Sequence, residues 1–355
     1  MRILVVNPGS TSTKVALFQG ETLRKETVLP APRETGEALW DEFPARLQGI
    51  LDWLRQEEEP PDGLSAVVGR GGLLRPLEGG TYRVTPAMLS DARGNLQGIH
   101  ASNLGCALAR SLADAASEGA GEDVEAFVVD PVSTDEFADL ARYSGLKELE
   151  RKSLSHALSI HALVREVCLR DGVRLESSAF VVAHLGGGIS ICPVKGGRIL
   201  DANNANSGGP FSPSRAGGLP VQELLDLAFS GHLSREELKR MTLKAGGLMS
   251  YLGTEDAREV EARIRDGDRE AEEVYGAMAY QIAKEIGAMA TVLRGDVEKI
   301  LLTGGLASST LLMDWVRERV AFLAPVEVWP EVAEMRALAL GGLRVLRGQE
   351  DAKEY

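Results

Sequence analysis

The feature that most constrains the fold of this chain is a strand–turn–strand pattern that occurs twice. An apolar, β-branched run at residues 3–6 leads through the turn NPGSTST to a second apolar run at residues 14–18. Residues 180–194 repeat this arrangement around three consecutive glycines. Short apolar runs that flank turn residues predict paired strands. Because each predicted hairpin begins one half of the chain, we expect two related domains with a boundary near residue 150.

The remaining pattern predicts helices that alternate with strands. Apolar residues at helical spacing predict helices, and short apolar runs predict further strands. The predicted helices cover residues 36–59, 103–116, 156–170, most of 221–294, 310–320 and 334–346, and the further strands cover 65–68, 126–129 and 299–302. The glycine-rich stretch 70–85 is predicted to be loop, and the polar tail from Gly348 is predicted to fray. This alternation predicts the α/β fold class.

Composition disfavours several classes of partner. Lys and Arg number 39 and Asp and Glu number 52 among the 355 residues, so the net charge is −13. Nucleic acids and anionic membrane surfaces attract clustered positive charge, so neither is expected as a partner. The sequence has no run of about 18 apolar residues that could span a membrane, and its three cysteines form no CxxC pair. We therefore expect a cytoplasmic protein without structural zinc or disulfides.

The first turn combines hydroxyl groups with a positive charge. Ser10, Thr11, Ser12 and Thr13 supply the hydroxyls, and Lys14 follows them. Hydroxyls and turn N–H groups can cradle phosphate oxygens, and Lys adds a compact positive charge. The turn is not a Walker loop, which requires glycine where Thr13 stands. Its sequence fits a phosphate-binding turn or an ordinary polar hairpin turn.

Two further turns at predicted strand ends are rich in glycine. The segment from His184 to Gly188 lies between apolar strands, where glycine suits a closely approaching phosphate, or a bulge or barrel corner. The segment from Thr303 to Ser309 follows a strand and precedes a helix, so N–H groups and a helix N-terminus would meet there. That combination suits an anion or a nucleotide. No turn has the GxGxxG pattern, which disfavours a Rossmann dinucleotide site.

The motifs of this chain, taken in their order along the sequence, resemble those of the acetate kinase (acetokinase) family in the actin-like ATPase superfamily. The matching segments are NPGSTSTK at 7–14, GRGG at 69–72, HASNLG at 100–105, VVDPV at 128–132, RKSLSHALS at 151–159, HLGGGIS at 184–190, KGGRILDANN at 195–204, SRAGGLP at 214–220, LTGGLASS at 302–309 and AEMRALALGG at 333–342. The resemblance implies two actin-like (ribonuclease H-like) α/β domains with a nucleotide cleft between them. The first would cover residues 1–150, joined by the C-terminal helix 331–355, and the second would cover 151–330.

The resemblance implies a reversible, Mg²⁺-dependent carboxylate kinase that transfers the γ-phosphoryl group of ATP to a short-chain acid. Closure of the cleft would exclude water. Departures from the acetate pattern indicate butyrate or a branched short-chain fatty acid, with butyryl phosphate and ADP as products. Gly187 replaces the Asn of HLGNG, residues 305–309 replace GIGEN, and residues 129–133 replace an FDTAFH-like segment. The chain is also shorter than a typical acetate kinase.

Other functions stay open at this stage. An acetate or propionate kinase belongs to the same class of enzyme. A non-acyl actin-like ATPase would leave Arg70, Arg215 and His156 without an acyl partner. A sugar kinase would need Asp130 as a base that acts on a neutral hydroxyl. The preferred acid and the direction of the reaction also stay open, and the resemblance implies a homo-oligomer, either a dimer or a multiple of it.

The resemblance assigns three catalytic residues and one substrate ligand. Asp130, His156 and Arg215 would be catalytic, and Arg70 would bind the substrate carboxylate. Because a carboxylate is already ionised at pH 7, Asp130 fits the positioning of metal or water better than the role of a base. Three of these residues also have an ordinary alternative: an Asp that forms a turn before Pro131, a structural His on a helix and, for Arg70, a surface Arg in a glycine-rich loop.

The resemblance also assigns nucleotide and metal ligands. The residues that would bind ATP are Ser10, Thr11, Ser12, Lys14, His184, Gly186, Gly187, Gly188, Asp256, Arg258, Gly304, Gly305 and Ser308. Asn7 and Glu334 would help to hold Mg²⁺, and Glu331 lies close enough in sequence to take the place of Glu334. Asp256 and Arg258 also fit a solvated helix face.

Overall fold

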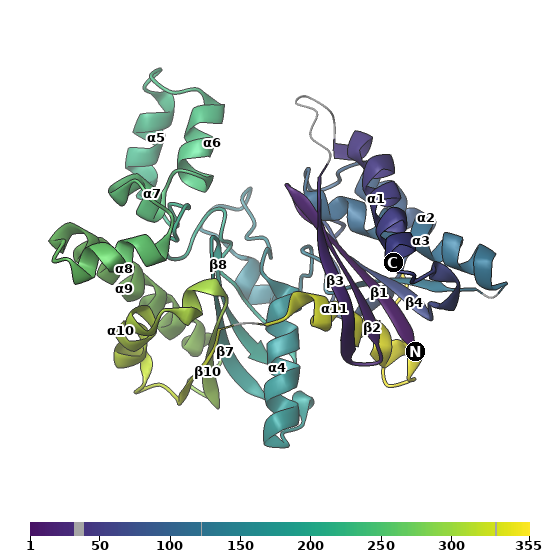
Figure 1. Ribbon diagram of the computed structural model, residues 1–355. Coiled ribbons are helices and arrows are strands. Elements are labelled where there is room, and N and C mark those ends of the chain that lie inside the picture. The colour runs from purple at the N-terminus through teal and green to yellow at the C-terminus, as the bar shows by residue number, and fades with distance from the viewer. Residues whose placement is uncertain (32–38, 122, 331) are drawn as a thin grey trace. The chain divides into compact units, whose positions relative to one another are not determined.

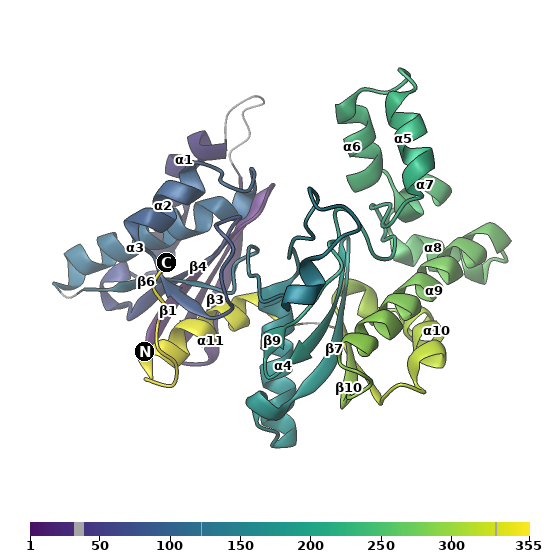
Figure 2. The same cartoon turned by 180° about the vertical axis from the view of Figure 1, so that it is seen from behind.

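Each of the two predicted hairpins lies in a sheet of its own. The computed structural model describes residues 1–31, 39–121, 123–330 and 332–355 (Figure 1 and Figure 2). The chain divides into two compact units. Unit 1 comprises Met1–Asp135, Ala157–His161 and Ala333–Tyr355, and unit 2 comprises Glu136–His156 and Ala162–Val332. None of the helices in the described ranges is both long enough and apolar enough to cross a membrane.

The sheet of unit 1 is built around the first hairpin. Its strands are β1 (Arg2–Pro8), β2 (Ser12–Gln19), β3 (Thr22–Pro30), β4 (Ala66–Arg70), β5 (Thr81–Arg83) and β6 (Glu125–Val129), in the order β3-β2-β1-β4-β6-β5. Strands β1, β2 and β3 are antiparallel neighbours, whereas β4 and β6 run parallel to β1. The carboxyl ends of β1, β4 and β6 therefore meet at one edge of the sheet.

Helices cover both faces of this sheet. They are α1 (Phe43–Gln56), α2 (Pro86–Arg93), α3 (Leu104–Ala120) and α11 (Glu334–Leu346). Successive side chains of a strand point to opposite faces, and Leu4 and Val6 share a core with residues of α1 and α3. On the other face, α11 packs closely because it carries Gly341 and Gly342. A Cβ at these positions would come within 2.4 Å of the Val129 side chain and 2.6 Å of the Val68 side chain.

Unit 2 contains the second hairpin and a long helical insertion. Its strands are β7 (Ala179–Leu185), β8 (Ile189–Lys195), β9 (Arg198–Ile199), β10 (Lys299–Thr303) and β11 (Val326–Trp329). Its helices are α4 (Ala157–Asp171), whose first turn groups with unit 1, α5 (Val221–Phe229), α6 (Arg235–Leu243), α7 (Gly247–Leu252), α8 (Ala257–Arg265), α9 (Arg269–Val292) and α10 (Thr310–Val320). Val181, Ala183 and Ile191 share a core with α9 and α10. Figure 1 shows α5 and α6 side by side, projecting from the rest of unit 2.

The two sheets have the same strand order. In unit 1, β3, β2 and β1 are followed across the sheet by the parallel strands β4 and β6. In unit 2, β9, β8 and β7 are followed by the parallel strands β10 and β11. Strand β5 is an addition at the edge of unit 1. The two predicted hairpins, and the α/β class predicted from the alternation of helices and strands, are therefore confirmed.

The structure also contains short elements that the sequence pattern did not reveal. Strand β5 lies in the stretch 70–85 that is predicted to be loop, and antiparallel pairing with β6 holds it. The prediction that the tail frays is wrong, because the Lys353 N–H donates to the Thr81 carbonyl at 2.8 Å and the Tyr355 hydroxyl lies 2.8 Å from the Asp91 carboxylate. The predicted helix 36–59 contains α1, but residues 36–38 lie outside the described residues.

Candidate active site

Unit 1 brings three of the predicted site residues to neighbouring strand ends. Asn7 lies near the end of β1, Arg70 is the last residue of β4, and Asp130 directly follows β6. In the sheet, Val6 pairs with Gly69, and Arg70 pairs with Val129. The carboxyl ends of parallel strands are where α/β proteins commonly bind ligands. The amide, the guanidinium and the carboxylate therefore share one edge of unit 1.

Arg70 is a buried cation with an unsatisfied donor. The residue is only 8% exposed, so the alternative of a surface arginine in a loop is wrong. Its Nη1 atom is buried and has no hydrogen-bond partner among the described residues. Burial of a charged donor without a partner is unfavourable. A carboxylate or phosphoryl oxygen would satisfy this nitrogen, and the guanidinium fork suits both.

Asp130 is held in an uncommon conformation. It is 3% exposed, and its φ angle is 39°, in the region that non-glycine residues rarely adopt. Its Oδ1 atom accepts a hydrogen bond from the Gly80 N–H at 2.7 Å and lies 2.9 Å from Nδ1 of His161. Such strain persists only where the surroundings enforce it, and it is common at functional sites. His161 is not among the predicted site residues, although a second histidine in the helix after His156 was a visible signal.

Asn7 and Glu334 lie in direct contact. The Asn7 side-chain amide donates to Oε2 of Glu334 at 3.2 Å, and the Ser159 hydroxyl donates to Oε1 at 3.4 Å. Magnesium ions prefer oxygen ligands and are usually held by one or two carboxylates together with substrate phosphates. No group of three or more His, Cys, Asp or Glu side chains suited to a metal occurs in the described ranges. The donor set therefore fits an ion that arrives with phosphate ligands, whereas Glu331 lies outside the described residues.

The first turn presents exposed donors. The Gly9 N–H donates to the Ser12 carbonyl at 2.7 Å, which closes the turn between β1 and β2. Ser10 and Thr11 are exposed, and within the described part of the chain their N–H groups make no hydrogen bond. Lys14 is also exposed and pairs with Asn7 across the hairpin. This geometry is compatible with the predicted phosphate-binding turn.

Two histidines of unit 2 stack on each other. His184 lies in β7, and His156 immediately precedes α4. Their ring centroids are 3.9 Å apart, and their planes differ by 14°. Nδ1 of His156 lies 2.9 Å from the hydroxyl of Ser190, which pairs with His184 in the sheet. The stack and this contact fix the orientation of the His156 ring beside the glycine turn.

The glycine turn of unit 2 lies directly under Arg215. A Cβ at Gly188 would come within 2.7 Å of Nη1 of Arg215, so the guanidinium rests where only glycine leaves room. The Ser212 hydroxyl donates to the Gly187 carbonyl at 2.6 Å and accepts from the Arg215 N–H at 3.1 Å. Leu185 pairs with Ile189 without a shift in register, so the alternative of a bulge is wrong. Ser212 thus links the Gly187 carbonyl to the Arg215 N–H, and sequence reasoning missed this residue.

Burial also affects the electrostatics of Arg215. Desolvation lowers the pKa of its guanidinium from the ordinary value, but arginine stays protonated in proteins. Its Nη1 atom donates to Asn206 at 2.9 Å. A partly desolvated cation attracts an anion more strongly than an exposed one. The position therefore suits a phosphoryl oxygen near the Gly186–Gly188 turn.

The third predicted turn packs against the second. Thr303 pairs with His184, and a Cβ at Gly304 would lie 2.4 Å from the Leu185 carbonyl. Gly304 has a φ of 90°, which glycine adopts readily. Gly305 and Ser308 are exposed beside it, and Ser309 caps α10 through the Leu312 N–H at 3.0 Å. Unit 2 therefore gathers its two glycine turns at the ends of neighbouring parallel strands.

Asp256 and Arg258 engage each other. Asp256 caps α8 by accepting from the Arg258 N–H at 2.9 Å, and the two side chains form an ion pair at 2.7 Å. The hydrogen-bonded Arg258 guanidinium lowers the pKa of Asp256 to about 2. The Arg258 side chain is 91% exposed. Among the described residues, no hydrogen bond or ion pair joins this pair to the glycine turns, and its place beside a nucleoside stays a prediction.

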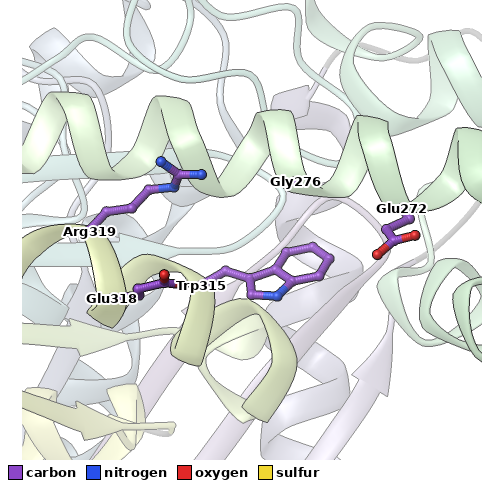
Figure 3. Close-up of a pocket in the computed structure, with 5 residues that line it drawn as sticks. All are labelled: Glu272, Gly276, Trp315, Glu318 and Arg319. Atoms are coloured by element: carbon purple, nitrogen blue, oxygen red, sulfur yellow. The ribbon is translucent and has the colours of Figure 1, made fainter.

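A separate cavity lies between α9 and α10. It has a volume of about 310 Å³ and is lined by Glu272, Gly276, Trp315, Glu318 and Arg319. Figure 3 shows the Trp315 indole between Glu272 at one end and Glu318 and Arg319 at the other. None of these is a predicted site residue. Its lining mixes both signs of charge around one aromatic ring, so the chemistry indicates no particular ligand.

The sequence of this chain is similar to those of known proteins. The sequence profile of the acetokinase family matches residues 151–327. The chain is 47% identical over 357 residues to "Probable butyrate kinase 2" of Caldanaerobacter subterraneus subsp. tengcongensis, and the match covers 100% of this chain and 99% of that protein.

The fold of this chain is also similar to those of solved kinase structures. The acetate kinase of Porphyromonas gingivalis matches with a TM-score of 0.78 at 18% identity, covering 97% of this chain and 99% of that one. A propionate kinase from Francisella tularensis matches with a TM-score of 0.74 at 18% identity, covering 96% and 98%. At these identities the likeness concerns the fold.

Proposed function

This chain belongs to the acetokinase family, and on that premise we propose that it transfers the γ-phosphoryl group of ATP reversibly to butyrate or a branched short-chain fatty acid. The products are the acyl phosphate and ADP. Family membership makes the protein a carboxylate kinase with an actin-like (ribonuclease H-like) fold, and the kinase reaction uses ATP. The choice of butyrate is the finer part of the proposal and draws on the 47% identical relative.

The observation that carries the proposal is the unsatisfied guanidinium of Arg70. Its buried Nη1 atom lacks a partner among the described residues, and the strand ends beside it hold Asn7 and Asp130. An anion with planar oxygens would satisfy this nitrogen. In the proposal, that anion is the carboxylate of the substrate. A kinase that acts on a neutral sugar hydroxyl would leave the buried donor without a charged partner.

The reaction requires positioning more than acid–base chemistry. The substrate carboxylate is ionised at pH 7, so it attacks phosphorus without losing a proton. The protein must hold two anions together and stabilise charge on the transferred phosphoryl group. We assign Arg70 to the carboxylate, and His156 and Arg215 to the phosphoryl oxygens. Asp130 would then orient water or metal, as its constrained geometry allows.

The turns would hold the nucleotide. Hydroxyl and N–H donors of the Ser10–Ser12 turn, Lys14 and the Gly186–Gly188 turn would contact ATP phosphates, with Gly304, Gly305 and Ser308 as the third group. Asp256 and Arg258 would lie beside the nucleoside. When bound, Mg²⁺ would neutralise phosphate charge, with Asn7 and Glu334 as its protein ligands. Their contact at 3.2 Å supports this assignment.

Gly187 is one of the departures from the acetate pattern on which the proposed preference for a longer acid rests. A Cβ built at Gly187 meets no described atom within 4 Å, so the turn leaves open space where acetate kinases carry an Asn. Butyrate has two more methylenes than acetate, and burial of each is worth about 0.8 kcal/mol. A fitted apolar pocket would favour butyrate by on the order of tenfold in kcat/KM.

Trapping of the acyl phosphate with hydroxylamine tests the proposal. The purified protein is assayed with ATP, Mg²⁺ and each of acetate, propionate, butyrate, isobutyrate and valerate, and the hydroxamate is measured as its coloured ferric complex. We expect the highest kcat/KM with butyrate or isobutyrate. Equal or higher efficiency with acetate or propionate would contradict the butyrate assignment but leave the carboxylate kinase. ADP release that depends on glucose, or on no acceptor, would identify a sugar kinase or a non-acyl ATPase.

The proposal extends to assembly and location. We propose a homo-oligomer in the cytoplasm, where ATP is supplied and where the free, buried Cys106, Cys168 and Cys192 stay reduced. Helix α5 exposes Val221, Leu225 and Phe229, which are spaced four residues apart and so share one face. Sedimentation velocity tests self-association, and a monomer at micromolar concentration would contradict it. Cell fractionation tests the location.

A further inference from the structure

Arg46 lies beneath the first turn and is almost completely buried. It belongs to the first turn of α1, and its side chain is 1% exposed. Its guanidinium donates to the Thr13 hydroxyl at 2.8 Å, the Ser12 carbonyl at 3.3 Å and the Gly9 carbonyl at 3.0 Å. Nε and Nη2 also donate to Oε2 of Glu42 at 2.9 and 2.6 Å. These five bonds use the full donor capacity of an arginine.

These contacts decide which groups of the turn face outward. The Gly9 and Ser12 carbonyls, which would repel a phosphate, bond to Arg46. Ser10 and Thr11 are exposed, and their N–H groups make no hydrogen bond within the described ranges. Phosphate oxygens are acceptors, so they bind where N–H and hydroxyl donors converge. Two carbonyls of the turn are thus bound by Arg46, while the N–H groups of Ser10 and Thr11 make no bond within the described ranges and stay available.

We propose that Arg46 is a positioning residue for ATP, which holds the first turn with its donors free for the nucleotide phosphates. The inference rests on the proposed role of that turn in ATP binding. Glu42 neutralises the charge of the buried Arg46 side chain in an i,i+4 ion pair. The Arg46 guanidinium therefore does not itself bind phosphate. Arg46 therefore acts through Gly9, Ser12 and Thr13.

The second hairpin shows an equivalent arrangement. The Gly187 carbonyl accepts a hydrogen bond from the Ser212 hydroxyl at 2.6 Å, and Ser212 is 1% exposed. In both duplicated hairpins, a buried side-chain donor from a later segment binds a carbonyl of the turn. The donor types differ, an arginine in one unit and a serine in the other. The common feature is a turn carbonyl that is bonded to a buried side-chain donor. Its presence in both units supports a functional role for this bond.

ADP binding tests the inference apart from catalysis. Arg46→Lys keeps the charge opposite Glu42, but a single ammonium group cannot reach all the acceptors of the guanidinium. We expect its Kd for ADP, measured by isothermal titration calorimetry, to rise by on the order of tenfold, the effect of losing one well-formed hydrogen bond. The KM for ATP should rise in parallel, while the KM for butyrate stays within about twofold. An unchanged Kd for ADP would overturn the inference.

Two further variants keep the test decisive. Arg55→Lys is the matched control, because Arg55 lies on the same helix but is 74% exposed, and its one partner among the described residues is Asp52. Its Kd for ADP should match that of the wild type. If Arg46→Lys does not fold, Thr13→Val removes the hydroxyl that accepts from Nη1 of Arg46 and leaves the bonds to the Gly9 and Ser12 carbonyls in place. Unchanged ADP binding in that variant would also overturn the inference. A wild type that binds ADP but forms no acyl phosphate would refute the proposed function alone.

Discussion

Nδ1 of His161 lies 2.9 Å from Oδ1 of Asp130, and both side chains are only 4% exposed. The contact joins the first turn of α4 to the end of β6 within unit 1. The same Oδ1 atom accepts from the Gly80 N–H at 2.7 Å. One carboxylate oxygen is thus fixed from two sides, and the orientation of Asp130 is set before any ligand binds.

Replacement of Asp130 by Asn tests whether Asp130 positions metal or water, or instead acts as a base that removes a proton. Asn keeps an oxygen that can accept from Gly80 but removes the negative charge. If Asp130 positions metal or water, kcat/KM should fall by on the order of 10² at every pH, as for loss of a preorganised charged group. Raised Mg²⁺ should restore part of the activity. A loss that disappears at high pH and does not respond to Mg²⁺ would instead indicate a base.

Replacement of His161 by Leu should destabilise the protein. Removal of the His161 ring leaves the buried Asp130 carboxylate without one of its hydrogen-bond partners, and a buried charged group that loses a partner carries a large desolvation penalty. We expect a loss of about 3 kcal/mol in the free energy of unfolding, measured by urea denaturation monitored by circular dichroism. His161→Gln keeps a side-chain donor and should recover at least half of this loss. A Leu variant as stable as the wild type would show that the contact contributes little.

Arg70 and Arg215 should differ in which kinetic constant they affect. Replacement of either by Ala should lower kcat/KM by on the order of 10³, as for a positioned arginine in phosphoryl transfer. Arg70→Ala should mainly raise the KM for butyrate, whereas Arg215→Ala should mainly lower kcat. Folding of the Arg70 variant should change little, because Nη1 of Arg70 has no partner to lose among the described residues, whereas the Arg215 variant loses its bond to Asn206. A variant that keeps more than a tenth of the activity would refute the role of that arginine.

Two neighbouring glycines offer a matched pair of substitutions. A Cβ at Gly188 would lie 2.7 Å from the Arg215 guanidinium, whereas a Cβ at Gly187 meets no described atom within 4 Å. Gly188→Ala should therefore displace Arg215 and lower kcat by at least about tenfold, the effect of losing one phosphoryl contact. Gly187→Ala should have a smaller effect on kcat. Steady-state kinetics of both variants measure these effects on kcat. An equal loss of kcat in the two variants would mean that the position of Arg215 over Gly188 is unimportant.

The sequence predicted what local patterns control. The two hairpins, the long helices and the location of Arg70 and Asp130 at strand ends all follow from short-range spacing. In the structure, His184 and Gly304 come together because β7 and β10 are neighbours, and the repeated turn pattern had already suggested that they share a function. The roles of the individual residues remain predictions until the variants are measured.

The sequence could not reveal partners that are distant along the chain. His161 contacts a residue 31 positions away, Arg46 bonds to one 33 positions away, and Ser212 bonds to one 25 positions away. Each looks ordinary in its own segment, because only the fold supplies its partner. Strand β5 was missed for the same reason, since its three residues are strand only through pairing with β6. Long-range pairing also orders the tail around Lys353.

The discontinuity of unit 1 has a consequence for synthesis of the protein. The last strand of its sheet ends at Val129, but α11, which packs on Val68 and Val129, begins only at Glu334. About 200 residues must therefore emerge from the ribosome before this apolar face is covered, which takes roughly 10 to 40 s at ordinary rates of translation. Unit 1 is the first part of the chain to start folding and the last to finish. A nascent chain that stalls before α11 leaves that face exposed to chaperones and proteases.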